Sequence, residues 1–317
     1  MNHVEDTSTN DSISVPSSKT KNSRRRGISV ELVGGLGNQL FIYATGYELS
    51  QKLGCPLYVD TTWFRTQADR KIGLNLFTNN AIFTSSQPLI RRAEIQIHKI
   101  MAPLLSKSTN VFVESKMDYL PEVSKLPVGS TLRGYFQSWK YFQEYAPKIR
   151  MQIYGLLNPS EWYQTRRVEF QDQENWVAVH VRRGDYLNAG TRDVHGITGV
   201  DYYKNAVEQI DSQFGNQMPL KIFSDDHSAA QTLFQGDERR IEFVQEPPNS
   251  NPLENMLLMS QGSGIIAANS SFSWWAAWLG ESITRPVIVP NPWFRTKSIN
   301  QDDLFLQDWT PLDGGLH

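Results

Sequence analysis

The stretch ISVELVGGLGNQLFIYATGYELSQKLGCPLYVD, residues 28–60, predicts a strand, a glycine-rich turn, a helix and a second strand. Residues 28–33 alternate apolar and polar side chains, which is the period of a strand. After the glycines, apolar residues recur on one face of a helix: Leu40, Tyr43, Ala44 and Tyr47. Gly54 supplies a stop, and residues 56–60 form the next strand. This order of elements indicates a βαβ unit.

The alternation of strands and helices becomes regular in the second half of the chain. The predicted strands there are Trp176–Val181, Leu220–Phe223, Ile241–Val244, Gly264–Ala268 and Pro286–Val289. The predicted helices between most of them are Tyr202–Ile210, Ser228–Phe234, Leu253–Ser260 and Trp274–Leu279. Strands that are apolar on both faces and alternate with helices predict a parallel, doubly wound α/β sheet. Ligands of such sheets bind beyond the carboxyl ends of the strands.

The pattern between these two regions is less regular. Residues 91–105 have helical character, and residues 145–164 are interpreted as helix and connector. A length of 317 residues accommodates two domains of ordinary size or one large α/β domain. We expect two, with an N-terminal domain at 27–160 and a C-terminal domain at 161–317. Residues 1–26, rich in Ser, Thr, Asn and Asp, are predicted to be a disordered tail.

The composition excludes several classes of protein. A net charge of −2 gives no indication of a protein that binds nucleic acid or lies on an anionic membrane. Cys55 is the only cysteine, so a disulfide within the chain and a CxxC site are excluded. No apolar run approaches the roughly 18 residues of a spanning helix, and the tail lacks a signal core. We expect a cytoplasmic protein with at most peripheral membrane contact, through Arg24–Arg26.

Four polar motifs follow predicted strands, and GGLGNQ, residues 34–39, is the first. A glycine-rich turn at a helix start lets backbone N–H groups approach a phosphate. A dinucleotide fingerprint would also use Asp60, but Leu40 stands where its third glycine belongs. A tight turn without a ligand is the equal alternative, and the polar pair after Gly37 favours a ligand. The predicted contacts of this turn are Gly35, Gly37, Asn38 and Gln39.

The motif HVRRGDY, residues 180–186, follows the first strand of the second half. Two guanidiniums at a strand end can grip a diphosphate, and Arg182 and Arg183 stay charged at any working pH. Neighbouring residues of an extended strand point to opposite faces, so we expect only one arginine to reach the ligand. His180 either donates to a phosphate or sugar oxygen or is a satisfied core residue. Asp185 is either a general base or a structural partner of an arginine.

The motif FSDD ends the next strand and offers two carboxylates, Asp225 and Asp226. One carboxylate at such a place commonly accepts from ribose hydroxyls or a base edge, and the other caps the following helix. The residues alone do not assign these two roles.

The motif NSSFSWWAAWL, residues 269–279, joins a strand to a tryptophan-rich helix. Hydroxyls and unpaired N–H groups at Ser270 and Ser271 can hold phosphate, or the serines can simply cap the helix. The tryptophans are predicted to pack against the sheet because of their helical spacing.

Spacings typical of metal sites are absent from the sequence. No two Asp residues are separated by one residue, and the six His show neither HxH nor HxxxH spacing. A diphosphate leaving group would then have to be neutralised by arginine and by helix ends. We therefore expect no metal ion and no other cofactor.

Taken together in this order, the four motifs resemble those of the α-1,2-fucosyltransferases of glycosyltransferase family 11. The resemblance runs from about residue 28 to 312 and extends to GYFQSWKYF (134–142) and DWTPL (308–312). It implies a GT-B-like pair of Rossmann-type domains, with the acceptor on the N-terminal side and the donor GDP-fucose on the C-terminal domain. The implied reaction is a metal-independent transfer, with inversion, to the 2-hydroxyl of a terminal galactose. That galactose would belong to a surface glycan or a lactose-type oligosaccharide.

The resemblance also implies roles for single residues. Arg182 matches the family's key arginine and would hold the diphosphate. Asn38 would face the diphosphate and the acceptor, so Arg182, Asp185 and Asn38 are the candidate catalytic residues. The other residues implied to line the GDP site are His180, Arg183, Asp225 or Asp226, Asn269, Ser270, Ser271 and Phe272.

Two other classes of protein are alternatives to a fucosyltransferase. A dinucleotide-dependent oxidoreductase would use the glycine-rich turn and Asp60, but it leaves HVRRGDY without a role. A non-catalytic module that binds a GDP-sugar would keep the arginines and transfer nothing.

Overall fold

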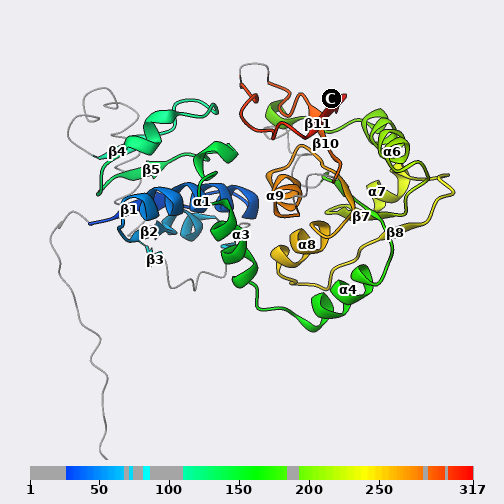
Figure 1. Cartoon of the computed structure of the whole chain (residues 1–317), viewed down its shortest axis with the longest axis horizontal. Coiled ribbons are helices and arrows are strands. Elements are labelled where there is room, and N and C mark those ends of the chain that lie inside the picture. The colour runs from blue at the N-terminus through cyan, green and yellow to red at the C-terminus, as the bar shows by residue number, and fades with distance from the viewer. Residues whose placement is uncertain are drawn as a thin grey trace, which may run out of the picture.

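The computed structural model describes residues 26–67, 71–73, 81–85, 110–183, 193–280, 285–296 and 299–316. Within these ranges the chain forms two parallel sheets, one in each half of the sequence (Figure 1). The N-terminal sheet contains β1 (Ile28–Glu31), β2 (Leu57–Asp60), β3 (Ala81–Thr84), β4 (Val111–Val113) and β5 (Thr131–Arg133). The C-terminal sheet contains β6 (Val177–Val181), β7 (Leu220–Ser224), β8 (Ile241–Phe243), β9 (Gly264–Ile266), β10 (Val287–Asn291) and β11 (Thr310–Asp313).

Helices connect the strands of both sheets. Those of the N-terminal half are α1 (Leu36–Lys52), η1 (Thr62–Thr66), η2 (Pro121–Lys125), η3 (Trp139–Tyr141) and α3 (Ala146–Gly155). Those that follow are α4 (Glu161–Gln171), α6 (Val200–Phe214), α7 (His227–Leu233), α8 (Pro252–Met259) and α9 (Ser271–Leu279). The boundary predicted at residue 160 lies in the connector between α3 and α4.

In each sheet the strands are parallel, and the order in which the chain adds them reverses near the centre. The C-terminal order is β11-β10-β9-β6-β7-β8, with β6 between β7 and β9. This is the doubly wound order in which the chain proceeds outward first on one side and then on the other. The N-terminal order is β3-β2-β1-β5-β4, with the reversal between β1 and β5. Because all the strand pairs are parallel, each sheet gathers its carboxyl ends at one edge.

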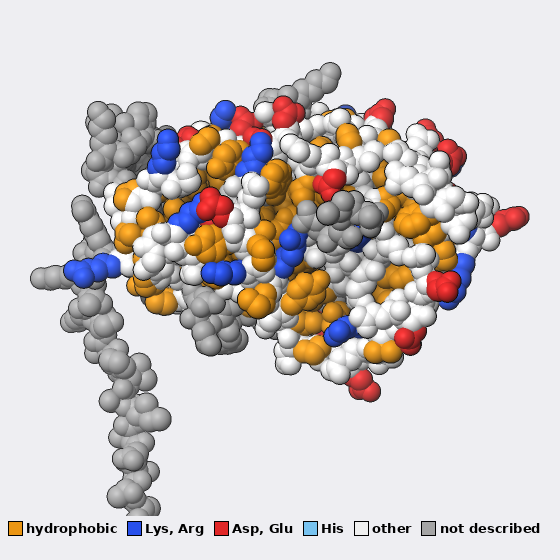
Figure 2. All heavy atoms as spheres, in the orientation of Figure 1, with side chains coloured by type: hydrophobic (Ala, Val, Ile, Leu, Met, Phe, Trp, Pro, Cys, Tyr) orange, Lys and Arg blue, Asp and Glu red, His pale blue; other side chains and the backbone are white. Residues whose placement is uncertain are grey.

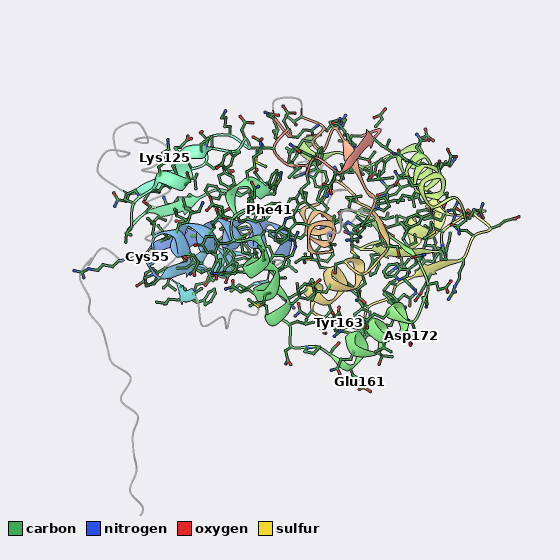
Figure 3. All side chains as sticks on the ribbon, in the orientation of Figure 1. Phe41, Cys55, Lys125, Glu161, Tyr163 and Asp172 are labelled. Atoms are coloured by element: carbon green, nitrogen blue, oxygen red, sulfur yellow. The ribbon has the colours of Figure 1, made fainter. Side chains whose placement is uncertain are left out.

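The helices α1 and α9 join the two halves through an aromatic core. The ring of Phe41 lies 4.4 Å from that of Trp274 and 5.1 Å from that of Trp275, and it occupies the middle of the molecule (Figure 3). The Nε1 of Trp275 donates to the carbonyl of Gly37 at 2.9 Å. A Cβ on Gly37 would lie 2.5 Å from the carbonyl carbon of Ser271. The lack of a side chain at Gly37 therefore permits the approach of the two helices.

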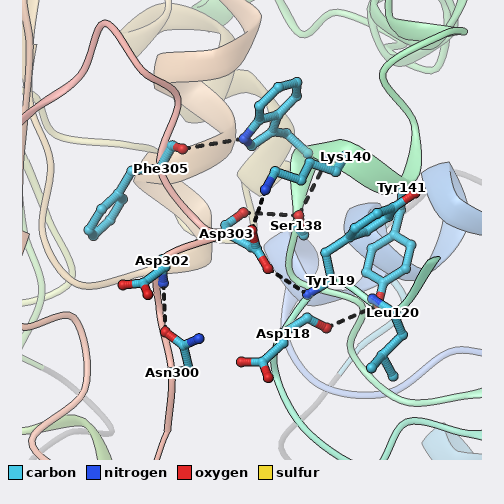
Figure 4. Close-up of polar contacts among 11 residues, drawn as sticks. Asp118, Tyr119, Leu120, Ser138, Lys140, Tyr141, Asn300, Asp302, Asp303 and Phe305 are labelled. Carbon is cyan, nitrogen blue, oxygen red and sulfur yellow. Dashed lines mark hydrogen bonds and ion pairs between the residues drawn. The ribbon is translucent and has the colours of Figure 1, made fainter.

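The end of the chain ties the C-terminal half back to the N-terminal half (Figure 4). Asp303 accepts from the backbone N–H of Tyr119 at 2.9 Å and forms an ion pair with Lys140. The carbonyl of Asp303 also accepts from the hydroxyl of Ser138 at 2.9 Å. These three contacts come from one residue, so Asp303 fixes the returning segment on the N-terminal half.

The charged side chains are distributed without a continuous basic surface on the face in Figure 2. Lys and Arg side chains of the described residues stand mainly over the N-terminal half, separated by apolar and neutral atoms. Acidic side chains stand mainly around the rim of the C-terminal half.

The strands and helices predicted from residue 176 onward are confirmed, with ends that differ by a few residues. The tryptophans of α9 are buried, as their spacing predicted. The helix predicted at 91–105 and the tail before Arg26 lie outside the described residues. Four short strands, β3, β4, β5 and β11, were not predicted.

Candidate active site

A cavity of about 590 Å³ lies between the carboxyl edges of the two sheets. Its N-terminal wall is made by residues that follow β1, β2 and β5: Gly34, Gly35, Leu36, Gly37, Asn38, Trp63, Gln67, Tyr135 and Gln137. Its C-terminal wall is made by residues at the ends of β6 to β10: His180, Arg182, His195, Phe223, Ser224, Asp225, Glu246, Pro252, Asn255, Asn269, Ser270, Ser271, Phe272 and Trp293. The four motifs singled out in the sequence thus meet at one place.

The glycine-rich turn supplies an open helix start to the cavity. Gly34 has a φ of +76°, which favours glycine, and a Cβ there would lie 2.8 Å from the side-chain Nδ2 of Asn38. Gly35 is the N-cap of α1 and provides no side-chain hydrogen bond. The Oδ1 of Asn38 accepts from the side chain of Gln137 at 2.8 Å, which joins the turn after β1 to the segment after β5.

Asp225 organises the two arginines. Its Oδ2 lies 2.9 Å from the Nη1 of Arg182, and its Oδ1 accepts from the backbone N–H of Arg183 at 2.8 Å. Arg182 lines the cavity, whereas the guanidinium of Arg183 donates to the carbonyl of Thr198 at 3.1 Å. Asp226 caps α7 by accepting from the backbone N–H of Ala229 at 3.0 Å. The two carboxylates therefore have different structural roles, with Asp225 on the cavity wall and Asp226 at the helix start.

His180 is a buried neutral residue on the central strand of the C-terminal sheet. Its side chain is 4% exposed, and its ring lies 5.6 Å from that of Phe272. Burial, and then the positive charge of Arg182, lowers the pKa of His180 from 6.5 to about 3. Its Nδ1 has no hydrogen-bond partner among the described residues. Since the imidazole is neutral at physiological pH, one ring nitrogen donates and the other accepts.

The first turn of α9 forms the rest of the C-terminal wall. Ser270 is its N-cap, and the hydroxyl of Ser270 accepts from the backbone N–H of Phe272 at 3.3 Å. The side chain of Asn269 donates to the carbonyls of His195 at 2.8 Å and Trp293 at 3.3 Å. Asn269 thereby holds the segments after β9 and β10 together behind the cavity.

Three of the residues predicted to contact the donor do not line the cavity. Gln39 is buried, and its amide donates to the carbonyls of Gly34 and Lys71 at 3.0 and 3.1 Å. Gln39 therefore braces the turn from behind. Arg183 and Asp226 have the partners described above, and Asp185 lies outside the described residues.

The family model of glycosyl transferase family 11 matches residues 118–313, which is more than half of the chain. The chain belongs to glycosyltransferase family 11. It is 30% identical to the O-antigen biosynthesis glycosyltransferase WbnK of Escherichia coli, over 89% of this chain and 99% of that protein. It is 29% identical to the alpha-1,2-colitosyltransferase of Escherichia coli, over 90% and 99%. It is 22% identical to galactoside alpha-(1,2)-fucosyltransferase 2 of Pongo pygmaeus, over 93% and 82%.

Membership of family 11 confirms the resemblance stated from the motifs, and the chain is a glycosyltransferase. The two facing parallel sheets confirm the predicted GT-B-like α/β class. The family membership, unlike the fold, argues against a dinucleotide-dependent oxidoreductase.

Several cavity residues of this family 11 protein were missed in the sequence. Trp63 and Gln67 follow β2, Tyr135 and Gln137 follow β5, and Glu246 follows β8. The fragment GYFQSWKYF contains Tyr135 and Gln137 and resembles the family, so it was the one signal that pointed to them. The others stand in segments without a glycine turn or a paired charge.

No group of three or more His, Cys, Asp and Glu side chains in the described ranges could hold a metal ion. None of the helices in this part of the chain is both long and apolar enough to cross a membrane. The reaction without a metal stays a prediction.

Proposed function

We propose that this glycosyltransferase moves L-fucose from GDP-fucose to the 2-hydroxyl of a terminal galactose, with inversion and without a metal ion. Two relatives support the linkage and the sugar class, because one is named for α-1,2 transfer of colitose and the other for α-(1,2) fucosylation of a galactoside. The observation that carries the proposal is the meeting of Arg182 with the first turns of α1 and α9 in one cavity.

The diphosphate of the donor fits the place where these positive groups converge. A helix start carries a partial charge of about +0.5, and its first N–H groups have no partner within the helix. Arg182 adds a full charge, and Asp225 holds its guanidinium at the cavity wall. Without a ligand these positive groups repel one another. A bound diphosphate would form charge-assisted hydrogen bonds with them and offset this repulsion.

The nucleoside of the donor fits the wall formed after β7 and β8. Glu246 and Asn255 both line the cavity there, and the amide of Asn255 donates to the carboxylate of Glu246. A carboxylate can accept from the two neighbouring N–H donors of guanine, which adenine does not offer in that arrangement. We assign this pair to the base, with Phe223 on the same wall.

The transfer step balances without an added reactant. The acceptor oxygen forms a bond to the anomeric carbon of fucose while the bond from that carbon to the β-phosphate oxygen breaks. Arg182 and the start of α9 stabilise the charge that grows on the departing phosphate. The acceptor hydroxyl loses its proton to a base, for which Asp185 is the candidate. Attack on the face opposite to GDP inverts the configuration.

Incubation of the full-length chain with GDP-fucose and lactose, with and without EDTA, tests the proposal. We expect GDP and a 2′-fucosylated product, identified by NMR, at equal rates in both samples. GDP-colitose in a parallel reaction tests the donor, because colitose lacks the 3-hydroxyl of fucose. A kcat/KM that is higher with GDP-colitose than with GDP-fucose would overturn the donor assignment.

Arg182→Ala tests the residue that carries the proposal. We expect kcat to fall about 100-fold or more, on the scale of a lost preorganised donor. Arg166→Ala is the matched control, since Arg166 and Arg182 have side chains that are each 24% exposed and paired with carboxylates. Arg166 does not line the cavity. Turnover of Arg182→Ala within a few-fold of the control would contradict the assignment.

A further inference from the structure

A second cavity, of about 450 Å³, opens at the carboxyl edge of the N-terminal sheet. Its size is within the range of small-molecule sites. Its walls come from the ends of β1, β4 and β5. These three strands are neighbours in the N-terminal sheet (Figure 1). The lining residues are Glu31, Val33, Val113, Glu114, Ser115, Lys116, Met117, Arg133, Gly134 and Tyr135.

The second cavity continues from the first. Tyr135 lines both, and Val33 in the second cavity precedes Gly34 in the first. The shared wall is the N-terminal one, which lies across from Arg182 and α9. A molecule that reaches from the reaction centre toward the N-terminal sheet would therefore enter the second cavity past Tyr135.

The backbone around Tyr135 is held in an unusual conformation by Glu114. The two oxygens of Glu114 accept from the backbone N–H groups of Tyr135 at 2.6 Å and Phe136 at 3.0 Å. Phe136 has a φ of +52°, and a Cβ on Gly134 would lie 2.4 Å from the Cβ of Glu114. Non-glycine residues keep positive φ only where their surroundings impose it, and such positions cluster at ligand sites. The carboxylate thus fixes the place of the Tyr135 ring, which is 39% exposed.

The chemistry of the walls suits a sugar. Arg133 and Glu31 form an ion pair of 2.6 Å, which presents planar donors and acceptors side by side. Sugars offer neighbouring hydroxyls that donate and accept together, and they offer C–H faces that pack on aromatic rings. The second cavity supplies both kinds of partner, in Arg133, Glu31 and Lys116 on one hand and Tyr135 on the other.

We propose that the second cavity binds the second sugar of the acceptor, the residue to which the reacting galactose is linked. This inference rests on the proposed function, because it places that galactose in the first cavity. The enzyme then recognises a disaccharide unit, and Glu114 acts as a positioning residue through Tyr135. The acceptors expected to react best are galactosides whose aglycone is itself a sugar.

Saturation-transfer NMR on the full chain with GDP and lactose tests this inference. We expect the protons of both sugar rings to receive saturation in the wild type. Val113→Trp fills the second cavity, and Val113 is 53% exposed on the edge strand β4, so the fold tolerates the larger ring. The matched control is Ile82→Trp, since Ile82 is 49% exposed on β3, the opposite edge of the same sheet.

The expected result is loss of saturation on the glucose ring and a tenfold or larger rise in the Kd for lactose in Val113→Trp, but not in Ile82→Trp. Lys116→Ala provides a second variant, because Lys116 lines the second cavity and its side chain is 60% exposed. A glucose ring without saturation in the wild type, or equal lactose binding in all variants, would overturn the inference.

Transfer measured on the same samples separates the two proposals. Saturation of both rings without any 2′-fucosylated product refutes the proposed donor and reaction, and it supports the second cavity as a sugar site. Product formation with saturation of the galactose ring alone refutes the second cavity and supports the proposed function.

Discussion

The neutral state of His180 predicts a pH dependence of stability that one substitution should remove. The pKa of His180 is lowered to about 3 in the folded chain, while an unfolded histidine keeps a value near 6.5. A depressed pKa means that the unfolded chain binds the proton first as the pH falls. The stability contributed by the neutral imidazole is therefore full above pH 6.5 and is lost between pH 6.5 and about 3.

The size of the effect follows from the two pKa values. Between pH 7.5 and 5.0, protonation of the unfolded histidine lowers the free energy of unfolding by about 2 kcal/mol, and His180 stays neutral in the fold. In His180→Asn this loss is absent, because asparagine does not titrate. Every other titrating group, Glu114 included, is common to both proteins and cancels in the difference.

Urea unfolding followed by tryptophan fluorescence at several pH values measures this difference. We expect the free energy of unfolding of the wild type, minus that of His180→Asn, to fall by about 2 kcal/mol from pH 7.5 to 5.0. Nitrogen NMR of the imidazole should show the neutral form throughout this range. A difference that stays constant with pH, or a protonated ring at pH 5.0, would refute the reasoning.

Three further predictions concern residues that hold the cavity in place. Asp225→Asn should lower kcat about tenfold, because Arg182 loses the carboxylate that orients it. The Kd for GDP should change little, because the loss of this orientation is offset by the loss of a negative charge near the diphosphate. Asp226→Ala, tested beside Asp225→Asn, should lower only stability, by about 1 kcal/mol; equal effects on kcat would contradict the two roles. Gly37→Ala should cost about 1–3 kcal/mol in urea unfolding, since its Cβ meets backbone, and unchanged stability would contradict that contact. Asp303→Ala should speed cleavage by protease and lower the free energy of unfolding by about 1–3 kcal/mol. Asp302→Ala, at the exposed neighbouring residue, is the control and should change neither (Figure 4). Equal cleavage rates of the two variants would contradict the role of Asp303 in holding the two halves together.

The C-terminal sheet was predictable because its strands carry a strong local signal. Four of its strands, β6, β7, β9 and β10, are almost entirely buried, and such runs differ clearly from the segments between them. The strands β3, β4 and β5 have three or four residues each and only partly buried patterns. β3 pairs with β2, β5 with β1 and β4 with β5, and these pairings depend on contacts between distant segments, which no local pattern reports.

For the candidate site, too, part could be predicted from the sequence and part could not. Strand ends placed His180, Arg182, Asp225 and Ser271 at one edge, because the carboxyl ends of parallel strands meet there. The assignment of Asp225 and Asp226 needed the structure, since both carboxylates suit both roles. Only packing distinguishes the one beside an arginine from the one beside a helix start.

The structure gives the glycine-rich turn a second role. From the sequence, Gly37 was a candidate phosphate contact. In the fold its bare Cα also lets the start of α1 lie against Ser271, at the start of α9. Two helix starts that would repel each other are held together by Trp275, whose Nε1 donates to the carbonyl of Gly37.

That enforced closeness supports the prediction that the transfer needs no metal ion. Two helix starts contribute a charge of about +1 between them, and Arg182 contributes another, which the carboxylate of Asp225, 2.9 Å away, offsets in part. A nucleotide-sugar diphosphate carries two negative charges and gains a third as the sugar departs. The positive groups are fixed in place before the donor binds, so the growing charge meets partners that need no rearrangement.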